Sequence, residues 1–368
     1  MKATLFFLLP MVVALGAGCG DLFGLAPPVQ GAGGGPSGAG AGSPGGHGIG
    51  GEALCQQLSL VCPDASPTTL ASQQFLPDGI AVDDTSVYWG TESGAQKLAK
   101  NLVDGTAPLT LAIGGSPLAL DALNVYFSTN NPIGRVWRVA KDGSGLTTLA
   151  QGSFVPGSIA VDDTSVYWTT VSESWTGTGA VMKVDLAGGP PTTLVVDDGN
   201  PVGMAIDATS IYWTTANGVK RVAKDGSQLT LLAADSAPGG IALDDTFVYW
   251  GKGLSAAMSP GGIGKVPKAG GPEVDFDGPE PSGLYPVTQL AVDDTNIYWM
   301  QLFSTFLLGS GVTNGAAMLE PKTGGAMVVV GFTFDPSSDV SPRHSLAVDQ
   351  TNVYWTNQDD GTVVTAPK

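Results

Sequence analysis

A ten-residue phrase occurs seven times along this chain, and its spacing restricts the fold more than any other feature of the sequence. The phrase begins with alternating apolar residues, continues through an Asp-containing group and ends in Val-Tyr-Trp or a close variant. Its seven tyrosines stand between 37 and 56 residues apart. A repeat of about 40–45 residues is typical of β-propellers, in which each unit is one blade of four short strands. The copies begin at Ile80, Leu118, Ile159, Met204, Ile241, Leu290 and Leu346.

Each copy predicts two strands joined by a tight turn, and two more strands follow it. Alternating residues such as Ile80 and Val82 indicate a strand, and the Asp and Thr after them favour a turn because their side chains accept backbone hydrogen bonds. Val87–Trp89 then forms the second strand. A third strand, such as 134–140, and a fourth, such as 146–150, are joined by a Gly-containing hairpin turn. The sequence therefore predicts an all-β, seven-bladed propeller with four antiparallel strands per blade.

The two ends of the repeat region predict how the ring closes. The chain ends at Lys368 with a segment like the third strand of the other blades, so the last blade lacks its fourth strand. Residues 66–84 align with residues 144–163, which contain a fourth strand. We therefore expect residues 68–73 to join the last blade as its outer strand, which leaves only short, protected edges.

An alanine and an aspartate recur at fixed places in every copy. The alanines, such as Ala81, lie in the first strand, which we expect to be innermost because only small side chains fit where seven sheets converge. The aspartates begin the turn: Asp83, Asp121, Asp162, Asp207, Asp244, Asp293 and Asp349. We interpret them as turn residues that accept local backbone hydrogen bonds. The alternative is a ring of carboxylates that binds a metal in the central funnel.

The Tyr-Trp-Thr phrases at Tyr167, Tyr212 and Tyr354 resemble those of YWTD-type and NHL-like propellers. The resemblance covers Ser66 to Lys368, and with the Gly-rich segment in front it extends to propellers of exported bacterial lipoproteins. It implies the fold but no single function, because propellers serve as binding modules, scaffolds and enzymes. YWTD propellers usually have six blades and an aspartate after the phrase. This chain departs from that pattern at Thr170, Thr215 and Asn357.

Residues 1–19 predict a secretory signal peptide whose end resembles a bacterial lipobox. Lys2 precedes an apolar stretch, and small residues precede Cys19. Cleavage before Cys19 would make it the lipidated N-terminus, and Gly20 after it favours outer-membrane sorting by the usual bacterial rule. Ordinary signal cleavage nearby, or an uncleaved signal, is the alternative.

Three segments are expected after the signal. Residues 20–51 are mostly Gly, Ala, Ser and Pro and predict a flexible tether. Residues 52–65 form a lead-in with Cys55 and Cys62, an even pair that suggests a disulfide in an exported chain. Residues 66–368 form the propeller.

The charge balance argues against two classes of partner. Sixteen basic residues against 33 acidic ones give a formal net charge of −17 at pH 7. Such a chain is not expected to bind nucleic acid or an anionic lipid surface, so its only membrane contact would be the N-terminal lipid. We expect a monomer without a cofactor in the cell envelope, as an outer-membrane lipoprotein or in the periplasm or at the cell surface.

One face of the ring carries the loops that differ most among the copies, and we call it the variable face. It holds the loops between second and third strands and the connections between blades, of which 301–315, 277–288 and 332–343 are among the longest. Binding sites commonly lie on long loops of a rigid scaffold. The predicted site for a protein or glycan comprises Trp175, Tyr285, Phe303, Phe306, Phe334, Arg343 and His344. The alternative is that Leu302–Leu308 folds inward and plugs the ring.

The sequence offers little for catalysis. It contains no GxSxG, HExxH or Gly-rich phosphate loop, and His344 is the only histidine of the predicted propeller. The favoured hypothesis is a non-catalytic binding or scaffold module anchored at the bacterial cell envelope. The alternative is a lyase or lactone hydrolase at the axial funnel, with His344 beside Asp339 or Glu280 as the acid–base pair and calcium as the metal if one is used.

Overall fold

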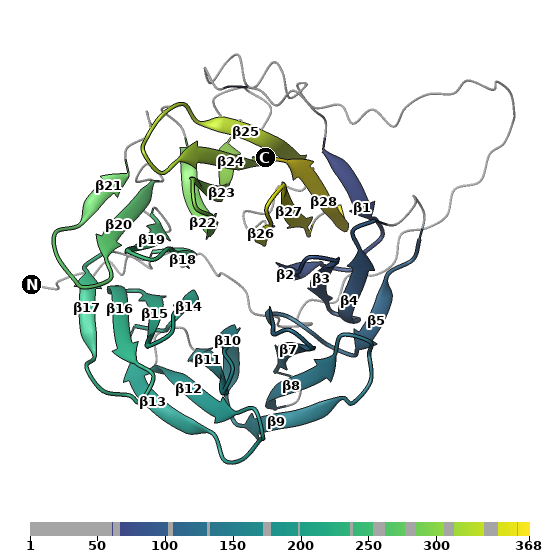
Figure 1. Ribbon diagram of the computed structural model, residues 1–368, viewed down its shortest axis with the longest axis vertical. Helices are drawn as coiled ribbons and strands as arrows, with labels where there is room; N and C mark the ends of the chain where they lie inside the picture. The colour runs from purple at the N-terminus through teal and green to yellow at the C-terminus, as the bar shows by residue number, and fades with distance from the viewer. Residues whose placement is uncertain are drawn as a thin grey trace, which may run out of the picture.

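The chain forms a ring of seven sheets around a central axis (Figure 1). The computed structural model describes residues 61, 67–101, 106–130, 133–171, 178–197, 199–235, 238–252, 262–276, 284–304, 313–334, 345–358 and 360–368. Each sheet has four antiparallel strands, so the predicted all-β, seven-bladed propeller is confirmed. Within the residues described, no helix is long and apolar enough to cross a membrane.

Blades 1 to 3 follow the order of the chain, with the first strand innermost and the fourth at the rim (Figure 1). Blade 1 contains β2 (Asp78–Val82), β3 (Ser86–Thr91), β4 (Gly94–Ala99) and β5 (Leu109–Ala112). Blade 2 contains β6 (Leu118–Leu120), β7 (Asn124–Thr129), β8 (Gly134–Ala140) and β9 (Thr147–Gly152). Blade 3 contains β10 (Val155–Val161), β11 (Ser165–Val171), β12 (Gly179–Asp185) and β13 (Thr192–Asp197).

The remaining blades repeat this order, except that the last one takes its outer strand from the N-terminal side. Blade 4 contains β14 (Met204–Ile206), β15 (Ser210–Thr215), β16 (Gly218–Ala223) and β17 (Thr230–Ala233). Blade 5 contains β18 (Ile241–Leu243), β19 (Phe247–Gly251), β20 (Ile263–Pro267) and β21 (Val274–Phe276). Blade 6 contains β22 (Leu284–Val292), β23 (Asn296–Ser304), β24 (Thr313–Pro321) and β25 (Val328–Phe334). Blade 7 contains β26 (Leu346–Val348), β27 (Asn352–Asn357), β28 (Thr362–Pro367) and β1 (Thr68–Ala71).

The ring closes where β1 pairs antiparallel with β28, as the alignment of the two ends predicts. Thr68 lies opposite Thr365 and Thr69 opposite Val364. The strand ends at Ala71, two residues earlier than expected, because the chain then turns toward blade 1. The Gln74 N–H donates to the carbonyl of Gly361, 2.8 Å away, and so ties this connection to the hairpin of blade 7.

The Tyr-Trp pair of the repeat explains how neighbouring blades pack. Adjacent residues of a strand point to opposite faces of the sheet, so the tyrosine and the tryptophan of one copy enter different inter-blade cores. Tyr167 of blade 3 packs with Trp213 of blade 4, and Tyr354 of blade 7 packs with Trp89 of blade 1. Both side chains of each pair are almost fully buried. The repeated phrase therefore builds the whole ring of interfaces.

The threonine that follows the Tyr-Trp pair links the second strand to the inner strands. The Thr214 hydroxyl accepts a hydrogen bond from the Gly203 N–H at 3.0 Å and donates to the Gly239 carbonyl of blade 5 at 2.9 Å. The same acceptor position in blade 2 belongs to Ser128, but its donor would be Pro117, which has no N–H. Ser128 therefore lacks this donor, and its buried hydroxyl has no partner among the described residues.

A buried donor and acceptor in blade 7 lead to a first prediction. In blade 6 the Trp299 indole N–H donates to Gln301 Oε1 at 2.9 Å. Asn357 holds the equivalent position in blade 7 and is one methylene shorter, and within the described structure both its Oδ1 and the Trp355 indole N–H lack partners. Asn357→Gln should therefore raise the free energy of unfolding by about 1 kcal/mol, the cost of an unsatisfied buried group. Urea denaturation measures this, and Gln301→Asn should lower stability by a similar amount; two changes of the same sign would contradict the assignment.

Candidate functional site

The repeated aspartates form a ring of blade-to-blade contacts on the face opposite the variable one, which we call the turn face. In each copy Oδ1 accepts hydrogen bonds from backbone N–H groups of the turn, as Asp207 does from Thr209 and Ser210 at 2.9 Å. Oδ2 accepts from the tyrosine of the same copy, for example Tyr212 at 2.9 Å. A lysine of the next blade completes the site, here Lys268, whose Nζ lies 3.1 Å from Asp207 Oδ2. The aspartates are therefore structural, as the turn interpretation predicts.

The same lysines lie over the tyrosine rings, so six of the seven blade-to-blade contacts combine an aspartate, a tyrosine and a lysine. Lys268 Nζ lies 5.7 Å from the centre of the Tyr212 ring. The equivalent contacts are Lys141 to Asp83, Lys224 to Asp162, Lys322 to Asp244, Lys368 to Asp293 and Lys100 to Asp349. Across the residues that the structure describes, no group of three or more His, Cys, Asp or Glu side chains could hold a metal. Six of the seven carboxylates of the ring thus face a lysine ammonium group.

These contacts shift the pKa values of the aspartates and of the tyrosines. Burial alone would raise the pKa of Asp244, but hydrogen bonds from Lys322, from the turn backbone and from Tyr249 outweigh it and lower the pKa to about 2. Burial, followed by the hydrogen bond to Asp207, raises the pKa of Tyr212 to about 12. The ring is therefore fully charged on the aspartates and neutral on the tyrosines over the physiological range.

One of the seven contacts lacks its lysine, and this gives a second prediction. Asp121 of blade 2 faces Leu186 of blade 3, which stands where the other blades have lysine, and the Asn124 amide donates to Asp121 instead. Leu186→Lys should raise the free energy of unfolding by about 0.5–1 kcal/mol, because it supplies a partly buried ion pair on a site already formed. Thermal unfolding at low salt measures the gain. Leu186→Met is the control for side-chain length, and an equal gain in both variants would contradict the ion-pair explanation.

Blade 6 projects beyond the ring on the variable face. Its β23 and β24 have nine residues each, against five to seven in the corresponding strands of the other blades. The hairpin of blade 4 ends at the pair Thr215–Gly218, but that of blade 6 continues for three further pairs, from Leu302–Gly315 to Ser304–Thr313. Three pairs add roughly 10 Å of strand. Segments 301–304, 313–315, 284–288 and 332–334, which we expected to be loops, are therefore strands, because they pair with one another beyond the repeat.

This projection brings three residues of the predicted site into one sheet. Tyr285 lies in β22, Phe303 in β23 and Phe334 in β25. Phe303 is opposite Asn314, and Asn314 is opposite Phe334, so the two phenylalanines occupy one row across the blade. The other predicted residues lie outside the described part of the chain: Trp175, Phe306, Arg343 and His344 of the binding site, Asp339 and Glu280 of the enzyme alternative, and Cys19, Cys55 and Cys62.

Asp78 joins three blades at the start of the innermost strand of blade 1, and sequence reasoning missed it. Its Oδ2 accepts a hydrogen bond from the Ser116 hydroxyl of the connection to blade 2 at 3.0 Å. Its Oδ1 accepts from the Ser345 hydroxyl of blade 7, also at 3.0 Å, and from the Gly79 N–H at 2.7 Å. The signal in the sequence is a lone acid where the other copies have Ser, Gly, Val, Thr or His. These bonds link blade 1 to blades 2 and 7, next to the place where the ring closes.

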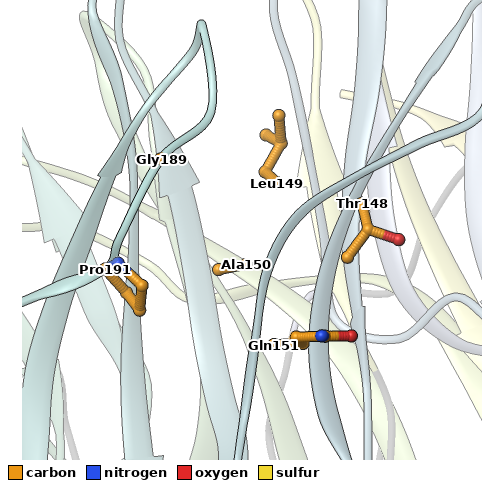
Figure 2. Close-up of a pocket in the computed structure, with 6 residues that line it drawn as sticks. All are labelled: Thr148, Leu149, Ala150, Gln151, Gly189 and Pro191. Carbon is orange, nitrogen blue, oxygen red and sulfur yellow. The ribbon is translucent and has the colours of Figure 1, made fainter.

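An open groove of about 370 Å³ lies at the rim between blades 2 and 3 (Figure 2). Residues of β9 form one side, and the turn before β13 forms the other. Its lining consists of Thr148, Leu149, Ala150, Gln151, Gly189 and Pro191. None of these side chains titrates, so the groove offers no acid, base or ion pair for catalysis.

Comparison with known proteins identifies the fold and no family. No protein-family model matches the sequence, and no curated protein matches it. Among solved structures, the chain is similar to an oligogalacturonate lyase in complex with manganese, with a TM-score of 0.56 and 12% identity over 80% of this chain and 89% of that one. It is also similar to the computationally designed Ika8 protein, with a TM-score of 0.54 and 14% identity over 82% and 98%. The AfRom2 CNH domain gives a TM-score of 0.54 and 10% identity over 82% and 99%.

These likenesses establish a propeller and leave the function open. An enzyme, a designed protein and a domain of a larger protein share the architecture at identities too low for more than the fold. Function has to be argued from the residues of this chain, and the part of the ring that departs most from the repeat is blade 6.

Proposed function

We propose that this protein is a non-catalytic binding or scaffold module of the bacterial cell envelope, which recognises a protein or glycan through its variable face. The observation that carries the proposal is the projection of blade 6. Seven copies of one repeat would give seven similar blades, yet one blade carries three extra strand pairs and two phenylalanines in one of the added rows. A paired strand extension from a closed ring is well suited to present residues to a partner.

The contact between the N-terminal side of the chain and the ring supports an orientation in which the variable face is free to meet a partner. Val61 pairs parallel with Val328 at the start of β25, and the Val329 N–H donates to the Val61 carbonyl at 3.0 Å. The start of β25 follows the turn between third and fourth strands, so this contact lies on the turn face. A tether of residues 20–51 attached to a lipid at Cys19 would therefore reach the ring from the turn face. The variable face would then point away from the membrane.

Shortening the projection tests the proposal, and this is the third prediction. Replacing residues 302–315 by the Ala-Asn turn of blade 4 and changing Ala316→Gly should preserve the ring, because Ala216–Asn217 already closes the equivalent hairpin. Crosslinking of the tagged, full-length protein in its native envelope should then lose its specific partners. The melting temperature should stay within a few degrees of that of the wild type.

The matched control exchanges the hairpin turn of blade 1, Glu92–Ser93, for the same Ala-Asn turn. This variant lies on the same face and should keep its partners. Unchanged capture by the shortened blade 6 would refute recognition through the projection. Failure of the wild type to capture anything, together with turnover of a glycan or lactone lost on His344→Ala, would favour the lyase or lactone hydrolase alternative.

A further inference from the structure

Two connections of the ring share a sequence pattern but place their phenylalanine differently. Residues 72–80 (SQQFLPDGI) align with residues 151–159 (QGSFVPGSI), so Phe75 corresponds to Phe154. Phe154 packs on Trp168, with ring centres 5.6 Å apart, and joins the core between blades 2 and 3. Phe75 is 60% exposed. The same motif thus buries one aromatic ring and presents the other.

The residue before each phenylalanine explains the difference. Trp89 and Trp168 hold equivalent positions, and Gln74 Oε1 accepts a hydrogen bond from the Trp89 indole N–H at 3.1 Å. Gln74 is also fixed through its backbone N–H by Gly361. Ser153 replaces Gln74 in the other connection, and among the residues described the Trp168 indole N–H has no partner. Gln74 therefore takes the place over the tryptophan that Phe154 takes in blade 3.

The backbone of this connection is strained in the exposed arrangement. Leu76 has φ of 48° and Gln73 has φ of 56°, a left-handed conformation that bulky L residues rarely adopt. Leu76 is 38% exposed and belongs to none of the core clusters formed by the described residues. Such strain persists where the surrounding structure enforces it, and strained residues cluster at ligand-binding sites. The structure thus holds an apolar pair outward at a cost in stability.

The surroundings of this pair are acidic. Asp78 follows two residues later, and the exposed Asp360 lies in the hairpin whose Gly361 bonds to Gln74. The lysines of blades 7 and 1 are engaged elsewhere: Lys97 bonds to the Lys141 carbonyl, while Lys100 and Lys368 bond to aspartates of the turn face. Of the ion pairs formed by the described residues, none involves Asp78 or Asp360. Asp78 is already held by the hydroxyls of Ser116 and Ser345, so a partner that covers Phe75 would meet chiefly the negative charge of the exposed Asp360.

The geometry points to a protein-docking surface centred on Phe75 and Leu76, over the seam between blades 7 and 1, that takes an apolar, positively charged protein segment. It rests on the proposed function, because it uses the same variable face, and it names the class of partner. An exposed Phe-Leu pair is an apolar anchor of the kind that protein interfaces bury, which favours a protein segment over a glycan. A second copy of the chain would bring its own net charge of −17 and is disfavoured by repulsion.

The probes for this surface are two synthetic twelve-residue peptides, one of Leu and Lys and one with Glu at every Lys position. Fluorescence anisotropy with the full chain should show binding of the Lys peptide and none of the Glu peptide. Phe75→Ser should weaken binding at least tenfold. Leu109→Ser, which removes an exposed leucine from the rim strand β5, should leave binding unchanged. Equal binding to Phe75→Ser and the wild type would mean general charge attraction and would overturn the inference.

Leu76→Gly tests whether peptide binding depends on the outward position of Phe75 and Leu76 and not on the stability of the fold. Glycine adopts positive φ without strain, so this variant should be at least as stable as the wild type. Its binding of the Lys peptide should nevertheless fall several-fold, because the Leu76 side chain is lost and Phe75 is held less firmly. Unchanged peptide binding, or a sedimentation dimer abolished by Phe75→Ser, would refute the inference. The blade 6 hairpin exchange distinguishes the two proposals: it should abolish envelope capture without affecting the peptide, whereas Phe75→Ser should affect the peptide directly.

Discussion

Ala71→Asp should lower the free energy of unfolding by about 3–5 kcal/mol and open the ring at its seam. Ala71 is 7% exposed in β1 and packs with Tyr354 and Trp89, so a carboxylate there would have neither water nor a cation. β1 continues directly into blade 1, and it is held to blade 7 by pairing with β28 and by packing. Its release would leave blade 7 with three strands and an exposed edge. Urea denaturation should show a lower midpoint and a less steep transition.

Ala112→Asp is the matched comparison for this fourth prediction. Ala112 holds the same place in β5, the fourth strand of blade 1, and is also 7% exposed. Because β5 follows β4 in the chain, its loosening leaves blade 1 connected in sequence. This variant should lose a similar amount of stability and keep the steepness of its transition, while Thr69→Asp on the exposed side of β1 should change little. A wild-type slope for Ala71→Asp would show that the seam is no weaker than the other interfaces.

The repeat made the ring predictable, because each copy contains the turn and strand residues that form its own blade. The Asp-Thr turn, the Tyr-Trp strand and the alignment of 66–84 with 144–163 were sufficient for the blade count, the strand order and the closing strand. The lysine contacts follow the same repeat and could have been found from the sequence, since a lysine stands after the third strand of every blade except blade 3, where Leu186 replaces it. Their partners lie one blade away, and only the closed ring reveals them.

The candidate site was less predictable, because it lies where the chain departs from its repeat. Residues 301–304 and 313–315 have no counterpart in the other copies, so nothing in the sequence showed that they pair as strands rather than form a loop. Phe75 shows the opposite limit. It aligns with Phe154, which packs on Trp168 in the structure, yet Phe75 is exposed and Gln74 bonds to the equivalent tryptophan, where the other connection has Ser153.

The contacts of the turn face should confine the stability of the ring to a defined pH range. Asp244 has a pKa lowered to about 2 in the folded chain, from an ordinary value near 3.8. A carboxyl with a depressed pKa stabilises the fold above its ordinary pKa, and this contribution is lost as the pH falls through the folded value. The other six aspartates of the ring also have lowered pKa values. Stability should therefore fall steeply between about pH 4 and pH 2.

The tyrosines set the alkaline limit of stability, because their pKa values are raised whereas those of the aspartates are lowered. Tyr167 and Tyr212 have pKa values raised to about 12 by burial and by their aspartates, from an ordinary value of 10.0. A group with a raised pKa contributes stability that is complete below its ordinary pKa and is lost as the pH rises through the folded value. Unfolding should therefore begin between about pH 10 and pH 12, together with tyrosinate absorbance. Circular dichroism across pH 2–12 measures both limits. Tyr212→Phe should move the alkaline limit upward, because it removes an ionisable hydroxyl. It should also raise the acid limit slightly, because Asp207 loses one of the hydrogen bonds that lower its pKa. A ring that stays folded while its tyrosines ionise would contradict this coupling.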